Sequence, residues 1–260
     1  MRTSFISHSF WCILLLLFSS CYSNKRLVYL QGDEFSTTKA TLVENRRQAY
    51  RLQPNDILSV QVKSSAASEI SNLFNVGSLQ NAMFASQGSL FLEGYSVDGS
   101  GKITLPVLGE VVVRNLTLDE VQELIQSHAN KYLNNATVIV KLTSFKITVL
   151  GEVKAPGHYF VYNNQATILE GLGMAGDLTS FGNRKNVKLI RQMPAGSQVV
   201  LVNLTHPGLL QSEYFFLHPG DVLYVEPLRA RTKRTNIEVM SLVFSAVTTA
   251  VLIMSFVNTN

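Results

Sequence analysis

Short segments of alternating hydrophobic and polar residues run through the centre of the chain and predict β-strands. Such alternation occurs in residues 50–63, on both sides of a Pro-Asn turn, and returns in residues 136–142 and 186–192. Two helices are expected between the strands, from Thr117 and from Thr167, because each threonine opens a T-x-x-E capping box that satisfies free backbone amides. Short mixed sheets with one helix each predict the α+β class.

Two pairs of repeated segments indicate that the chain contains two related modules. The segment VLGEV occupies residues 107–111 and again residues 149–153, with KIT upstream and a capped helix downstream in both places. A second pair, LQPNDILSV at residues 52–60 and LHPGDVLYV at residues 217–225, shares five residues in register around a turn that leads into a strand. We therefore expect each module to contain a strand, a VLGEV strand, a capped helix and further strands.

The N-terminal end has the features of an export signal. Residues 1–20 contain one arginine, an apolar run from Phe10 to Phe18, and small residues before Cys21. This ending resembles the lipobox of bacterial lipoproteins, which predicts a signal peptide over residues 1–20, lipid attachment at Cys21 and a polar linker over residues 21–48. The alternative is a plain secretory signal in which Cys21 has no role. In the lipoprotein interpretation Cys12 is removed, and the mature chain has no free thiol.

A membrane helix is predicted over residues 237–260, because the nineteen residues 239–257 contain no charge, proline or glycine. A terminal helix packed on a soluble core is the alternative. Hydroxyl side chains within the segment form one stripe at helical spacing: Ser241, Ser245, Thr248 and Ser255. The stripe is expected either to line a wet lumen or to allow close helix packing. In a monomeric anchor the same hydroxyls would instead bond the preceding turn.

Basic residues gather in residues 229–236, directly before the predicted helix: Arg229, Arg231, Lys233 and Arg234. Contact with lipid phosphates is the preferred interpretation, and contact with an acidic polysaccharide at a pore mouth is the alternative. Over the whole chain the formal charge is only +4, which is too mild to predict a nucleic-acid partner. A hydrophobic content of 46% predicts folded domains rather than disorder.

No catalytic residue, cofactor or metal site is predicted. Residues 171–176 match G-x-G-x-x-G, but the capping box at Thr167 places these glycines along and after a helix, where a dinucleotide loop is not expected. The histidines lack metal-ligand spacing. Glu110 and Glu152 occupy equivalent repeat positions and are interpreted as structural. The three aromatic residues within 159–162 are expected to pack across strands, with stacking on sugar rings as the alternative.

Four segments in order resemble the outer-membrane polysaccharide export family: YRLQPNDILSVQV, VDGSGKITLPVLGEVVVRNLTLDEVQELI, ITVLGEVKAPGHYFVYNNQATILEGLGMAGDLT and LHPGDVLYVEP. The resemblance extends from Tyr50 to Pro227. It implies a polysaccharide export domain over residues 49–143 and a soluble ligand-binding β-grasp (SLBB) domain over residues 144–228. The chain departs from the larger members of the family in having one β-grasp copy, which implies a shorter periplasmic part.

The resemblance also implies a function without catalysis. The chain would form a homo-oligomeric ring, mostly periplasmic and fixed to outer-membrane lipids through Cys21. Its C-terminal helices would assemble into a portal for capsular polysaccharide or exopolysaccharide, supplied by an inner-membrane polysaccharide co-polymerase. The competing hypothesis is a doubly anchored periplasmic lipoprotein that binds glycan or serves as a scaffold without a pore of its own.

Overall fold

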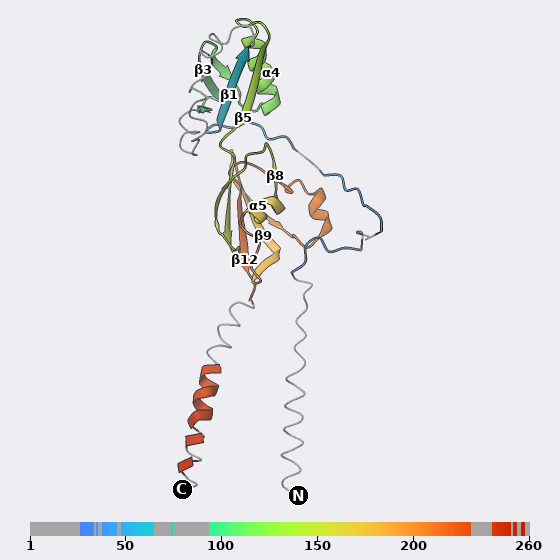
Figure 1. The fold of residues 1–260 in the computed structure, drawn as a ribbon, viewed down its shortest axis with the longest axis vertical. Helices are drawn as coiled ribbons and strands as arrows, with labels where there is room; N and C mark the ends of the chain where they lie inside the picture. The colour runs from blue at the N-terminus through green and yellow to red at the C-terminus, as the bar shows by residue number, and fades with distance from the viewer. Residues whose placement is uncertain are drawn as a thin grey trace.

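The computed structural model describes residues 27–33, 35, 38–45, 48–64, 74, 94–229, 241–250, 252–253 and 256–257. Most of them form two modules, each with its own hydrophobic core, which follow one another along the long axis of the molecule (Figure 1). Both modules combine strands with one α-helix, so the predicted mixture of helix and sheet is confirmed.

The first module consists of a small antiparallel sheet, a hairpin and one helix. Strand β1 pairs with β2 and β5, while β3 pairs with β4. The elements are β1 Ile57–Ser64, β2 Tyr95–Ser96, β3 Lys102–Leu105, β4 Gly109–Val112, α4 Leu118–Ala129 and β5 Ala136–Leu142. Helix α4 begins with the predicted capping box at Thr117. Its 3.6-residue period buries Val121, Ile125 and Ala129 in the core of this module.

The second module is built on a five-stranded sheet with the strand order β10-β9-β12-β6-β7, in which β12 and β6 run parallel. Its elements are β6 Lys146–Gly151, β7 Gly157–Phe160, β8 Ala166–Thr167, α5 Ile168–Met174, β9 Gly182–Met193, β10 Gly196–Val202, η3 Pro207–Gln211, β11 Phe216–Leu217 and β12 Val222–Pro227. The capping box at Thr167 opens α5, and Gly176 follows the helix with a φ of +72°. The predicted position of the glycines along and after a helix is therefore confirmed.

The repeated Pro-Asn-Asp and Pro-Gly-Asp segments have the same structure in both modules. Asn55 and Gly220 adopt positive φ values of +75° and +83° at equivalent positions. The next residue in each copy, Asp56 or Asp221, is buried, and its carboxylate accepts a hydrogen bond from the amide three residues earlier, at 2.9 Å and 2.7 Å. Each turn leads directly into a central strand, β1 or β12, as predicted.

Both VLGEV segments contain strand residues, but the strand begins at a different point in each copy. In the second copy, KITVLG forms the continuous strand β6. In the first, Pro106 lies between KITL and VLGEV, and a proline has a fixed φ and no amide for a sheet. The chain turns over residues 106–108, with a φ of +64° at Val107, and β4 then begins at Gly109, whose φ is +75°. Gly151, the equivalent of Gly109, also has a positive φ of +89°.

Part of the predicted linker binds to the second module before the chain reaches the first. The Leu30 amide donates to the Leu204 carbonyl at 3.1 Å. The Tyr29 hydroxyl donates to Asp177, and the Arg184 guanidinium lies 5.2 Å from the Tyr29 ring centroid. Burial, followed by the hydrogen bond to Asp177, raises the pKa of Tyr29 above its usual range. The chain then runs outside the second module toward β1, as the blue segment in Figure 1 shows.

At the C-terminal end, residues 241–250, 252–253 and 256–257 are helical, while the membrane helix expected over residues 237–260 stays a prediction. None of the helices found in the described residues is both long enough and apolar enough to cross a membrane.

Candidate functional site

Several of the predicted site residues lie outside the described residues. These are Cys21, Arg231, Lys233, Arg234 and Ser255. The remaining ones are exposed: Arg229 follows the end of β12, and Ser241, Ser245 and Thr248 lie in the helical residues 241–250.

The hydroxyls of the predicted stripe make local bonds within their own helix. Ser245 Oγ donates to the Leu242 carbonyl at 3.0 Å, and Thr248 Oγ1 lies 2.8 Å from the Phe244 carbonyl. Such bonds to the preceding turn satisfy hydroxyls on an apolar helix. They are the contacts expected of a plain anchor, and because the hydroxyls donate in them, both lone pairs of each oxygen stay available to donors from water or from another helix. The side chains of Leu242 and Phe244 are 70% and 62% exposed in the single chain, so this segment has an apolar surface to cover.

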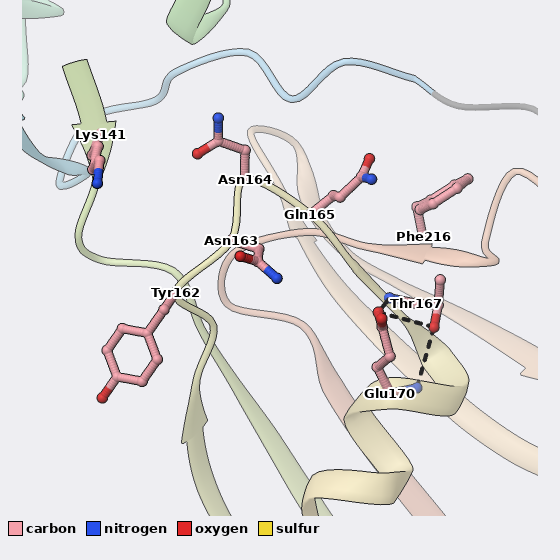
Figure 2. A pocket seen from close by; sticks show the side chains of 8 residues that line it. All are labelled: Lys141, Tyr162, Asn163, Asn164, Gln165, Thr167, Glu170 and Phe216. Carbon is pink, nitrogen blue, oxygen red and sulfur yellow. Dashed lines mark hydrogen bonds between the residues drawn. The ribbon is translucent and has the colours of Figure 1, made fainter. Parts of the chain in front are cut away.

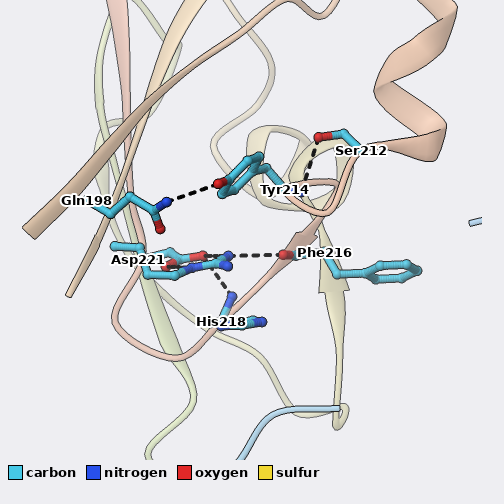
Figure 3. A network of polar contacts seen from close by, with 7 residues as sticks. Gln198, Ser212, Tyr214, Phe216, His218 and Asp221 are labelled. Atoms are coloured by element: carbon cyan, nitrogen blue, oxygen red, sulfur yellow. Dashed lines mark hydrogen bonds and ion pairs between the residues drawn. The ribbon is translucent and has the colours of Figure 1, made fainter. Parts of the chain in front are cut away.

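A buried ion pair between Arg191 and Asp221 links elements of the second module. Arg191 Nε and Nη2 donate to the two carboxylate oxygens of Asp221 at 2.9 Å and 2.7 Å, and Nη2 also donates to the Phe216 carbonyl at 3.2 Å (Figure 3). The Asp221 side chain is 0% exposed and that of Arg191 is 9% exposed. This pairing ties β9 to the turn before β12 and to β11. A bidentate, desolvated pair with further hydrogen bonds fixes its side chains in one geometry.

The same turn forms part of the junction with the first module. The ring of Tyr50 packs edge-on against His218, with 5.7 Å between centroids, and the Tyr50 hydroxyl donates to Asp56 at 2.9 Å. Burial, and next the positive charge of Arg191, lower the pKa of His218, so its neutral form is favoured. Burial raises the pKa of Asp56 despite the hydrogen bonds that it accepts. The two repeated turns therefore meet where the modules join.

Beside this junction lies an open recess of about 410 Å3, to which both modules contribute. Lys141, near the end of β5, comes from the first module, and the loop of residues 162–165 between β7 and β8 comes from the second. Thr167, Glu170 and Phe216 complete the lining (Figure 2). The volume falls within the range of small-ligand sites.

The aromatic residues of 159–162 divide into packed and exposed side chains. Tyr159 is partly buried against the core and donates to the Ala155 carbonyl, and Phe160 is also partly buried, which agrees with the preferred packing interpretation for these two. Tyr162 differs because it is 83% exposed. The alternative interpretation, contact with a sugar ring, therefore remains for Tyr162.

The acidic residues considered for chemistry have structural roles. Glu110 forms an exposed ion pair with Lys102 at 2.7 Å, and the buried Glu152 accepts from Thr179 Oγ1 at 2.8 Å. Within the described part of the chain, no cluster of three or more His, Cys, Asp or Glu side chains could hold a metal ion.

Sequence reasoning did not single out Arg191, Asp221, Lys141 or the amide loop 163–165 as functional residues. The duplicated Pro-x-Asp turn pointed to Asp221, but its partner lies 30 residues earlier in the chain. The run Asn-Asn-Gln after an aromatic strand was a visible signal for the loop.

Comparison with known proteins identifies the family. The model for polysaccharide biosynthesis/export proteins matches residues 44–143, and the model of the SLBB domain matches residues 146–202. The chain is 30% identical over 186 residues to the "EPS I polysaccharide export outer membrane protein EpsA" of Ralstonia solanacearum, covering 68% of this chain and 48% of that protein. The protein of the same name from Ralstonia nicotianae is 28% identical over 187 residues, covering 68% and 47%.

The chain spans about half the length of the curated relatives it matches. Both are named as export proteins rather than enzymes. The two family models lie side by side on the two modules, and together they cover most of the folded residues. The chain belongs to the polysaccharide export family, with an export domain followed by an SLBB domain.

Proposed function

We propose that this protein is a subunit of an outer-membrane polysaccharide export translocon. It forms an oligomeric portal through which capsular polysaccharide or exopolysaccharide leaves the cell. The observation that carries this proposal is the occurrence of both family domains in one chain whose curated relatives are named for exopolysaccharide export in the outer membrane.

Two attachments to the membrane would orient the subunit. Lipid on Cys21 anchors the N-terminal end, and the segment 237–260 crosses the outer membrane as a helix. Exposed apolar side chains such as Leu242, Phe244 and Phe256 support this, because such a surface must be covered by lipid or by other helices. The second module directly precedes the segment 237–260, and the linker that follows Cys21 bonds to it through Leu30, so this module would face the membrane.

A pore requires several copies, because one helix encloses no lumen. We therefore infer a homo-oligomeric ring in which the stripe of Ser241, Ser245, Thr248 and Ser255 faces water. The basic residues Arg229, Arg231, Lys233 and Arg234 would lie among lipid headgroups at the base of this helix bundle. An inner-membrane polysaccharide co-polymerase would supply the polysaccharide from the inner-membrane side.

The topology can be tested with the variant Asn260→Cys, since lipidation of Cys21 leaves the mature chain without another free thiol. Intact cells are treated with a membrane-impermeant maleimide, with lysed cells and the unsubstituted chain as controls. Labelling of intact cells supports a helix that crosses the outer membrane. Labelling only after lysis would refute the portal and leave the tail inside the cell envelope.

The second candidate is a doubly anchored periplasmic lipoprotein that binds glycan or scaffolds a secretion complex without a pore. The local hydroxyl bonds of Ser245 and Thr248 favour it, because they satisfy the stripe within one helix. Mass measurement of the complex in mild detergent distinguishes the two hypotheses. A ring gives one defined multiple of the subunit mass, whereas a strictly monomeric protein contradicts the portal.

A further inference from the structure

The recess between the modules combines an aromatic ring, amides and one available cation. The ring of Tyr162 points outward from the loop 162–165, away from Lys141 as well as from Thr167 and Glu170 (Figure 2). Its ring is 83% exposed, whereas the Tyr159 hydroxyl bonds to a backbone carbonyl of its own module. An exposed tyrosine offers an apolar face together with a polar edge, which suits the C–H face and the hydroxyls of a sugar ring.

The three residues after Tyr162 add hydrogen-bonding groups. Asn163, Asn164 and Gln165 are exposed, and among the interactions found in the described residues their side-chain amides have none with protein groups. Each amide offers two donors and one acceptor, and a sugar hydroxyl both donates and accepts. Three consecutive amides that follow an exposed tyrosine in the chain therefore match a polyhydroxylated ligand better than an apolar one.

The two charged side chains of the recess, Glu170 and Lys141, differ in whether they already have a bonding partner. Glu170 Oε2 accepts from the Thr167 amide at 2.7 Å and from Thr167 Oγ1 at 3.1 Å, so this carboxylate is held by the start of α5. Its negative charge also compensates the positive end of the helix dipole. Lys141 is exposed, and no ion pair of its ammonium is present in the described residues. The recess thus offers a positive charge that a sugar carboxylate can pair with.

We propose that this recess binds a uronic-acid-containing segment of the transported polysaccharide, with Lys141 on a carboxylate, the loop amides on hydroxyls and Tyr162 stacked on a neighbouring sugar ring. The identity of the ligand as transported polysaccharide rests on the proposed export function. The location between the modules means that a bound glycan would contact both domains at the same time.

The test uses the purified full-length protein in mild detergent, with tri-galacturonate as the probe and maltotriose as the neutral comparison. Saturation-transfer NMR at low salt reports the affinity. Tyr162→Ala is expected to weaken tri-galacturonate binding about tenfold, and Lys141→Gln about threefold, with the second effect lost at high salt. Tyr162→Phe, which keeps the ring, and Lys185→Gln, an exposed lysine on β9, are the matched controls and should change little.

Three outcomes overturn the inference: no binding of tri-galacturonate, equal binding of maltotriose, or binding that neither Tyr162→Ala nor Lys141→Gln weakens. Surface polysaccharide is measured separately in cells that lack the protein. If deletion abolishes it while the probe fails to bind, the recess inference fails and the export function stands. If the probe binds as expected while deletion leaves export normal, the recess stands and the export function fails.

Discussion

Replacing Arg191 with methionine tests whether the buried ion pair organises the second module. The substitution keeps the apolar stem of the side chain but leaves the Asp221 carboxylate, 0% exposed, with the His218 amide as its one close donor among the described residues. Removing one partner of a buried pair costs about 3–5 kcal/mol, because the remaining charge is desolvated without compensation. We expect a loss of this size in the free energy of unfolding of the second module.

Native-state hydrogen exchange measured by mass spectrometry suits this question, because it reports each module separately. Amides of β9 and β12 should lose protection, while those of α4 in the first module should change less. Arg51→Met removes the exposed pair with Glu120, whose side chains are 57% and 47% exposed, and should cost less than about 1 kcal/mol. The double variant Arg191→Met, Asp221→Asn should be more stable than Arg191→Met alone. A loss below about 1 kcal/mol for Arg191→Met would refute the reasoning.

The remaining predictions concern backbone strain, pH and export. Gly151→Ala should cost more than about 1 kcal/mol in chemical denaturation, because φ is +89° and the added Cβ would lie 2.1 Å from a backbone oxygen of β12; Gly99→Ala, in open space, should change little. Because the pKa of His218 is lowered in the fold, its contribution to stability is present above about pH 6.5 and falls as the pH drops below that value. Wild type should therefore lose more stability on acidification than His218→Gln, and equal losses would contradict this. Ser245→Leu with Thr248→Leu should reduce surface polysaccharide at unchanged protein level, and normal export would exclude the lumen assignment.

Local sequence signals predicted the parts of the fold that depend on neighbouring residues. The capping boxes at Thr117 and Thr167 fixed both helix starts, since each needs only residues within one turn. The Pro-x-Asp turns were equally predictable because proline, a residue with positive φ and a short acceptor act within four positions. The position of the glycines along and after α5 was predictable for the same reason.

Features that depend on distant residues were not predictable in the same way. The pairing of Arg191 with Asp221 spans 30 residues, and the contact of Tyr29 with Asp177 spans 148. The repeat VLGEV did not predict the strand bounds, because the first copy has two extra residues, Leu105 and Pro106, before it, and β4 begins only at Gly109. The recess is a further case, since Lys141 and the loop 162–165 are brought together only when the modules join.

The duplicated turn explains why the recess and the ion pair occur in the same region. In the first copy Asp56 is bonded to Tyr50, and in the second Asp221 is bonded to Arg191. Tyr50 packs on His218, which is three residues before Asp221, so the two turns contact each other through side chains that each turn already orients. Arg191 reaches the Phe216 carbonyl from the same position and thereby fixes one wall of the recess. Loss of Arg191 should therefore weaken both the stability of the second module and glycan binding, whereas loss of Tyr162 should weaken binding alone.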